Sequence, residues 1–188
     1  MSHWQILGRC IASPPPTDWR ERLLARLRSR PRRLGSWCEL GLFGALECLA
    51  DAGEDSLPDH ARLSVATRYG PDQALLGALR SAAEDGLPMP MAFLQSQPGQ
   101  LIAHFSAATG WLGDGRMLAC RQPIDALRLS CGAAEASELL LGWLDEREAA
   151  ACSIWLRLRR LPSSLLDTPP LPESVEDFVN PDFRFFRV

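Results

Sequence analysis

Cys120 is the side chain of this 188-residue sequence best suited to covalent chemistry. It lies just before a segment that begins at Pro123 and is predicted to be helical, and the N-terminus of a helix favours a reactive thiolate. Such a thiolate could attack an acyl group if a base and oxyanion donors were nearby. Because none of the three histidines is evidently positioned as a partner, the favoured interpretation of Cys120 is a buried or pocket-lining cysteine.

The other residues with ligand-binding potential form no recognisable centre. Six cysteines occur without a C-x-x-C pair, so no metal site is predicted. Gly110, Gly113 and Gly115 have neither the spacing of a dinucleotide-binding loop nor its place ahead of a helix. His104 lies in an apolar helical segment, where a packed histidine is commoner than a ligand. The sequence therefore predicts no metal and no cofactor.

Composition excludes several broad classes. The chain is 46% apolar and 23% charged, with a formal net charge of −3, which fits one globular domain and argues against a nucleic-acid binder. Its most apolar stretch, residues 139–144, is far shorter than the roughly 20 residues of a membrane-spanning helix. The first residues lack the pattern of a signal peptide, so a cytoplasmic protein is expected.

Strand and helix patterns alternate along the chain, which is typical of an α/β fold. Strands are predicted over residues 4–11, 63–67, 116–120, 139–143 and 152–159, with an extended piece over 89–95. Helices are predicted over residues 19–29, 36–52, 71–85, 100–109 and 123–134. We therefore expect a mixed, mostly parallel sheet with helices on both faces. From Leu161 the chain is rich in proline, and its phenylalanines are expected to dock on something.

Three segments, in order, carry a family resemblance. The first is ALECLADAG (45–53) followed by RLSVATRYG (62–70), and the second is PMAFLQS (90–96) with Ile102, Ser106, Gly110 and Gly113. The third is AC (119–120), then IDALRL (124–129) and ELLLG (138–142). Together they resemble the N-terminal half of a β-ketoacyl synthase, which has a thiolase-like fold. The resemblance covers residues 4–160 and implies a ketosynthase N-terminal-like domain over 1–160, with residues 161–188 as a tail that packs on the domain or on a partner.

The same resemblance implies a protein that is inactive on its own. The family takes its catalytic histidines and Gly-rich motifs from a second half that this sequence lacks, and Arg121-Gln122-Pro123 follow Cys120 where small residues are usual. The chain thus resembles the chain-length-factor-like subunits of aryl polyene and related pigment pathways, which pair with a complete ketosynthase. The alternatives are a minimal acyltransferase or condensing enzyme that uses Cys120 with His104 or a partner's residues, and a stand-alone acyl-binding module.

Partner contacts are expected at two sets of residues. The resemblance implies tunnel or partner positions at Phe93, Gln95, Met117 and Cys120. The arginine-rich stretch from Arg20 to Arg33 could dock an acyl carrier protein through Arg30, Arg32 and Arg33, although a solvated helix face is the simpler interpretation.

An oligomer is also predicted. The helix over 123–134 should lie across the sheet with one apolar face open, and an open apolar face marks an interface. The alternative is that the C-terminal tail, with Phe178, Phe183, Phe185 and Phe186, covers part of this face. We expect either a heterodimer with a full-length ketosynthase or a homodimer.

Overall fold

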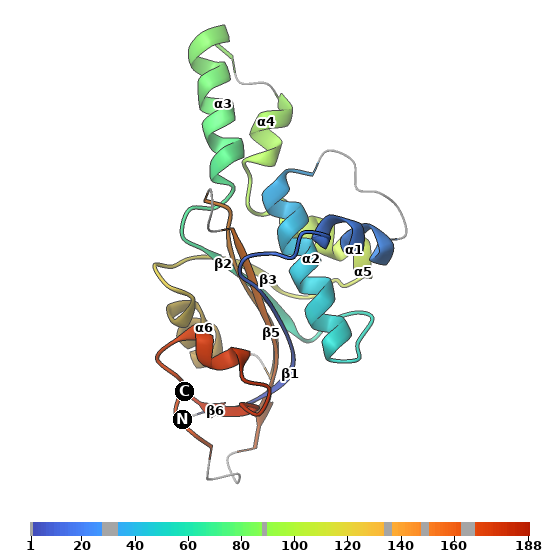
Figure 1. Ribbon diagram of the computed structural model, residues 1–188, viewed down its shortest axis with the longest axis vertical. Coiled ribbons are helices and arrows are strands. Elements are labelled where there is room, and N and C mark those ends of the chain that lie inside the picture. Colours follow the sequence, from blue (N-terminus) through green and yellow to red (C-terminus); the bar gives the residue numbers. More distant parts are fainter. Residues whose placement is uncertain (1, 28–33, 88–89, 134–136, 148–150, 163–167) are drawn as a thin grey trace.

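The computed structural model describes residues 2–27, 34–87, 90–133, 137–147, 151–162 and 168–188 (Figure 1). Within these residues the strands form one six-stranded sheet of order β3-β2-β4-β5-β1-β6. The strands are β1 (His3–Ala12), β2 (Arg62–Thr67), β3 (Gly115–Ala119), β4 (Glu138–Asp145), β5 (Cys152–Leu161) and β6 (Phe185–Arg187). β2 pairs in parallel with β3 and β4, whereas the pairs β4–β5, β5–β1 and β1–β6 are antiparallel. The predicted mixed α/β sheet is confirmed, and its parallel part is the β3-β2-β4 half.

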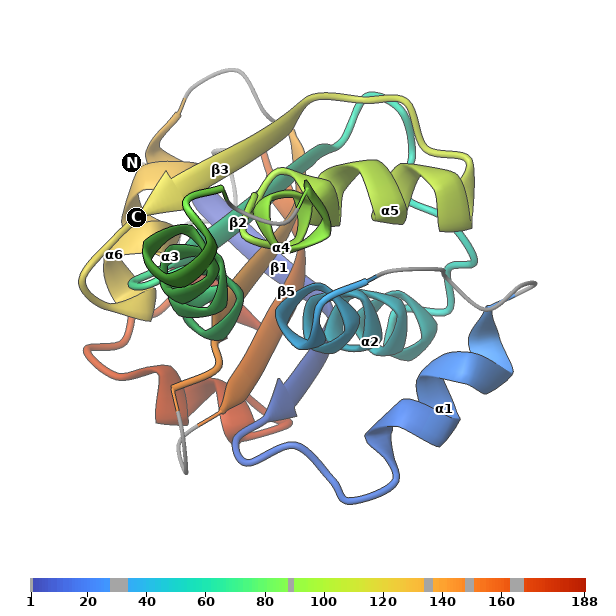
Figure 2. The same cartoon turned by 90° about the horizontal axis from the view of Figure 1, so that it is seen from above.

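Helices cover both faces of the sheet, as predicted (Figure 2). They are α1 (Trp19–Arg26), α2 (Ser36–Asp51), α3 (Asp72–Asp85), α4 (Pro90–Gln95), α5 (Gln100–Thr109), α6 (Pro123–Gly132) and the 3₁₀ helix η2 (Val175–Val179). α1, α2 and α5 pack on one face, while α6 and the tail with η2 pack on the other. α3 and α4 extend beyond the end of the sheet (Figure 1).

α2 is the central helix of its face, and the density of apolar residues that predicted its burial has a structural cause. Gly44 allows the helix backbone to approach β5 so closely that a Cβ there would overlap Ser153 Oγ and the Trp155 ring. Ser153 Oγ donates to the Leu40 carbonyl at 3.0 Å, and the Trp155 indole N–H donates to Ser153 Oγ at 3.0 Å. These bonds satisfy the polar atoms that this close contact buries.

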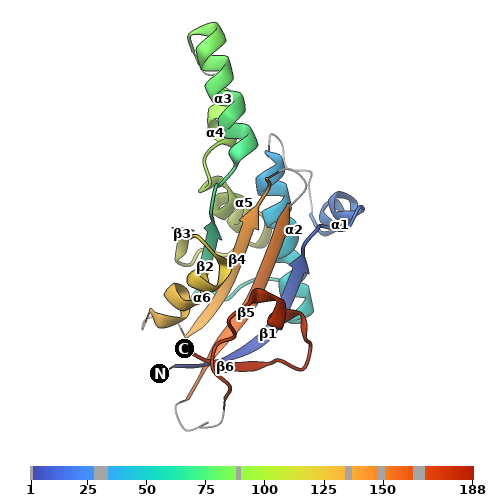
Figure 3. The same ribbon diagram turned by 60° about the vertical axis from the view of Figure 1, so that its left-hand side comes forward.

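The C-terminal tail packs on the α6 face of the sheet (Figure 3). Phe178 and Phe186 are fully buried and meet edge to face, with ring centroids 5.8 Å apart. Arg9 of β1 holds the tail, because its guanidinium donates to the carbonyls of Phe178, Asn180 and Phe183 at 2.8, 2.6 and 3.0 Å. The tail thereby adds β6 to the edge of β1 and supplies part of the core.

A buried ion network joins the loop after α2 to the sheet. Arg157 of β5 is completely buried, and its Nε and Nη2 donate to the two carboxylate oxygens of Glu54 at 2.6 and 3.0 Å. Nη2 also donates to Glu138 of β4. Burial alone would raise the pKa of Glu138, but hydrogen bonds from Arg157 and Arg159 hold that pKa below its ordinary value. No local sequence pattern predicts this network, because Glu54 and Arg157 are 103 residues apart.

The extended piece predicted over residues 89–95 is wrong, because Pro90–Gln95 form the helix α4. The Ser96 amide donates to the Ala92 carbonyl at 3.0 Å, and Ser96 Oγ bonds the Phe93 carbonyl at 2.8 Å. α4 lies against α3 (Figures 1 and 3), so tertiary packing favours a helix where six residues alone carry no clear period.

None of the helices in the described ranges has the length and apolar character needed to cross a membrane.

Candidate functional site

β3 offers an unpaired strand edge. It is the last strand of the sheet, and β2 is its strand neighbour among the described residues. The Leu63 amide donates to the Asp114 carbonyl and the Cys120 amide donates to the Thr67 carbonyl, each facing β2. Because these groups alternate along a parallel strand, the N–H and C=O groups of Gly115, Met117 and Ala119 face away from the sheet. A strand edge of this kind is a template for pairing with another chain.

The helical projection formed by α3 and α4 carries a second surface suited to binding a partner, which we call the α3–α4 surface. More than half of the large apolar side chains that the structure exposes lie on it: Leu75, Leu76, Leu79, Leu87, Phe93 and Leu94. Leu79 and Leu87 are 57% and 77% exposed. A concentration of exposed large apolar side chains on one pair of helices is typical of interaction sites in soluble proteins. Figure 1 shows that α3 and α4 stand clear of the body, where a partner can reach them.

Sequence reasoning identified only Phe93 of this surface. Leu75, Leu76 and Leu79 were inside a correctly predicted helix but were not singled out. The sequence signal was that this helix has more apolar positions than one narrow buried stripe needs. In the structure, Ala78 is the one buried residue among those of the helix that are described. A helix with exposed leucines and so little buried surface is not stabilised by its own core.

Cys120 follows β3 directly and precedes α6, as predicted. It is half-buried and packs against the apolar residues of the α6 face. Burial raises the pKa of its thiol, and the nearby Asp125 carboxylate in the first turn of α6 raises it further. Both effects oppose formation of the thiolate that a nucleophile at the start of α6 would need.

The three histidines, all within the described residues, have other surroundings. His3 Nδ1 lies 2.5 Å from Thr168 Oγ1. The exposed His60 side chain has its Nε2 atom 3.8 Å from Glu138 Oε1. His104 lines a cavity of about 200 Å³ with Cys38 of α2, and burial lowers its pKa. This cavity is on the α2 side of the sheet, opposite the apolar cluster that holds Cys120. Cys120 and His104 therefore do not form the nucleophile and base that a condensing enzyme would need.

The remaining predicted site residues are dispersed. Phe93 is 54% exposed on α4, whereas Gln95 lines the same cavity as His104. Met117 of β3 is half-buried against the α2-side core. These residues do not converge with Cys120 on one pocket. Their shared property is closeness to the β3 edge or to the α3–α4 surface.

The arginines of α1 are engaged within the chain. Arg20 pairs with Glu39 at 3.2 Å, and Arg22 and Arg26 both pair with Glu47, so α1 is fixed to α2. Arg30, Arg32 and Arg33, which were predicted to dock a carrier protein, lie outside the described residues. The parts of the chain that the structure describes contain no cluster of three or more His, Cys, Asp or Glu able to hold a metal ion.

Comparison with known proteins identifies the architecture. No family model and no curated protein matches the sequence. Among solved structures, a chain of AntDE:AntF, a type II PKS acyl-carrier protein in complex with its ketosynthase bound to the hexaketide, matches 84% of this chain with a TM-score of 0.64 and 11% identity. The ishigamide ketosynthase/chain length factor matches 89% of this chain with a TM-score of 0.64 and 14% identity. The chain has the ketosynthase/chain-length-factor fold.

The fold is shared with proteins of different length. The ketosynthase ApeO in complex with its chain length factor ApeC from Xenorhabdus doucetiae gives a TM-score of 0.58 at 15% identity over 85% of this chain. The ketosynthase-fold match covers 62% and 64% of the first two solved chains but 78% of the third. The predicted thiolase-like fold is confirmed, and the present chain spans less than two thirds of the first two relatives.

Proposed function

We propose that this chain is a chain-length-factor-like, non-catalytic subunit that pairs with a full-length β-ketoacyl synthase. The observation that carries the proposal is the unpaired edge of β3 beside the exposed α3–α4 surface. In this proposal the edge strand pairs with a strand of the ketosynthase, and the apolar side chains are covered by it. Residues 1–160 form the ketosynthase-like domain and residues 161–188 the added tail.

The surroundings of Cys120 support a subunit without its own chemistry. A condensing enzyme needs a thiolate, a base and oxyanion donors. Here the pKa of the thiol is raised, and each histidine has another environment. Catalysis would then belong to the ketosynthase, while this subunit shapes the space in which the chain grows. An acyl carrier protein as substrate donor, an aryl polyene or related polyketide or fatty-acid-type product, and a cytoplasmic location are parts of the same proposal.

The decisive experiment perturbs the outward edge of β3 without touching its bonds to β2. Met117→Pro removes an N–H that faces away from β2, and proline is tolerated at such edge positions. The matched control is Met117→Ala, which keeps the N–H. Each variant is purified with a tagged full-length β-ketoacyl synthase from the same genome, and the mass of the complex is measured by light scattering.

We expect wild type and Met117→Ala to give a heterodimer, and Met117→Pro to weaken it at least tenfold relative to Met117→Ala, with the two variants unfolding at a similar midpoint. Leu79→Glu should weaken the complex as well, whereas Leu24→Glu on the exposed side of α1 should not. A monomeric mass for the wild-type chain, both alone and with the ketosynthase, would contradict the proposal. A homodimer that excludes the ketosynthase would contradict it too.

A further inference from the structure

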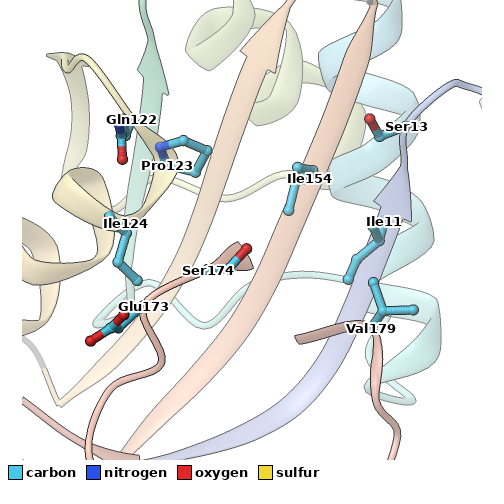
Figure 4. A pocket seen from close by; sticks show the side chains of 9 residues that line it. All are labelled: Ile11, Ser13, Gln122, Pro123, Ile124, Ile154, Glu173, Ser174 and Val179. Carbon is cyan, nitrogen blue, oxygen red and sulfur yellow. The ribbon is translucent and has the colours of Figure 1, made fainter. Parts of the chain in front are cut away.

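A cavity of about 370 Å³ lies under the C-terminal tail, on the opposite side of the sheet from α2 (Figure 4). We call it the tail cavity. Five of the nine lining residues are apolar: Ile11 of β1, Ile154 of β5, Pro123 and Ile124 of α6, and Val179 of η2. A volume above 300 Å³ with mainly apolar walls and a few polar groups is typical of a small-molecule site.

The tail cavity is a built feature, because separate elements of the fold fix its walls. β1 and β5 are paired through the residues of the floor, Ile11 opposite Ile154. Arg9 fixes the outer wall by bonding the carbonyls of Phe178 and Asn180 on either side of Val179. The floor and the outer wall are thus held in place by hydrogen bonds within the protein.

A second hollow adjoins the tail cavity. It has a volume of about 20 Å³, shares Pro123 and Ile154 with the tail cavity and is also lined by Trp143, Leu156 and Phe178. The smaller hollow is lined entirely by apolar residues, whereas the tail cavity opens between exposed polar residues. A narrow apolar hollow beside an open polar mouth fits a linear chain that enters with its apolar end first.

Charges of both signs lie at the mouth, so neither an anionic nor a cationic head is clearly favoured there. The polar lining residues are Ser13, Gln122, Glu173 and Ser174, and none of the residues lining the cavity is cationic. The Glu173 carboxylate repels an anionic head. The positive end of the α6 dipole, which starts at Pro123, opposes a cationic one. Hydroxyl and amide groups both donate and accept hydrogen bonds, and so they suit a neutral dipolar head.

We propose that the tail cavity binds a linear aliphatic molecule of medium length with a neutral hydrogen-bonding head, such as a primary alcohol or a carboxamide. This site is separate from the β3 edge and the α3–α4 surface, so it stands whether or not the chain pairs with a ketosynthase. The walls come from the tail, from α6 and from the neighbouring strands β1 and β5. Binding therefore depends on the tail being docked.

The test uses the full chain and the probes 1-hexanol, 1-octanol and sodium octanoate at pH 7. The chain contains five isoleucines, three of which line the cavity, so isoleucine methyl NMR locates the bound molecule directly. We expect 1-octanol to shift Ile11, Ile124 and Ile154 in a saturable manner. Ile6 and Ile102 are internal controls and should not move.

Affinity should rise about fourfold for each added methylene, hence about 16-fold from 1-hexanol to 1-octanol. Octanoate should bind at least tenfold more weakly than 1-octanol, and Glu173→Gln should narrow that difference. Val179→Trp, at an exposed position, should fill the mouth and abolish the shifts, and Ser174→Trp provides a second blocking variant. Leu24→Trp on α1 is the matched control. Shifts that survive both blocking variants, equal binding of octanoate, or no saturable binding of 1-octanol would each overturn the proposal.

Discussion

Replacing Arg157 with methionine is expected to destabilise the protein by about 3–5 kcal/mol, because it removes one partner of a buried ion network and leaves the others behind. The Arg157 side chain is 0% exposed, and Glu138 and Glu54 are only 13% and 21% exposed. Without the guanidinium, two carboxylates that share it would face each other with little water. For a domain of this size the loss corresponds to a fall in Tm of about 6–20 °C.

Urea unfolding followed by tryptophan fluorescence measures this loss, and Arg159→Met is the matched control. Arg159 pairs with the same Glu138 carboxylate but is 48% exposed, so its removal should lower the free energy of unfolding by less than about 1 kcal/mol. If both variants lose the same free energy, or if Arg157→Met loses less than about 1 kcal/mol, the stabilising role assigned to the network is wrong.

The pH dependence gives a second check. Because the pKa of Glu138 is lowered in the folded state, its contribution is present above its ordinary pKa of 4.5 and is lost as the pH falls through the folded value. Wild type should therefore lose stability below about pH 4.5 more steeply than Arg157→Met, whose Glu138 has lost its main partner. Parallel pH profiles for the two proteins would contradict the assigned cause of the shift.

Three further predictions concern the core, the glycines and the thiol. Phe178→Ala should lower the free energy of unfolding by about 3–5 kcal/mol and expose the tail to limited proteolysis, whereas Val179→Ala should change little; equal effects would refute tail anchoring. Gly44→Ala should destabilise by about 1–3 kcal/mol through overpacking against β5, while Gly77→Ala, with open space around it, should stabilise by up to about 1 kcal/mol in urea unfolding. Cys120 should react with iodoacetamide more slowly than free cysteine at pH 8 by peptide mass spectrometry, and faster alkylation would reinstate it as a nucleophile candidate.

The local elements follow from the sequence wherever a pattern is long enough to carry a period. The ten-residue run at β1 and the apolar run of α2 are predicted almost to their ends. α4 is not, because six residues fit either period and the choice is made by packing against α3. Short segments therefore depend on tertiary contacts that no local pattern records.

The candidate site was harder to predict, because its parts are remote in sequence. In addition, the β3 edge is defined by having no further strand beside it among the described residues. That β3 is an edge strand follows from the order of strands in the sheet, which the residues of β3 do not specify. Glu54 and Arg157 are 103 residues apart and meet only when the sheet assembles. The separation of Cys120 from His104 likewise results from helices packing on opposite faces, which the sequence pattern left open.

The order of strands also bears on how the chain is made. β1 is synthesised first, yet its neighbours β5 and β6 are synthesised last, so the nascent chain carries β1 apart from the β3-β2-β4 group until residues 152–161 have emerged. During that interval β1 and β4 each have exposed edges, and contacts so distant in sequence slow folding. β5 pairs with both β4 and β1 and so completes the sheet between them. The yield of folded protein should therefore depend on how long the ribosome takes to synthesise the chain as far as β5.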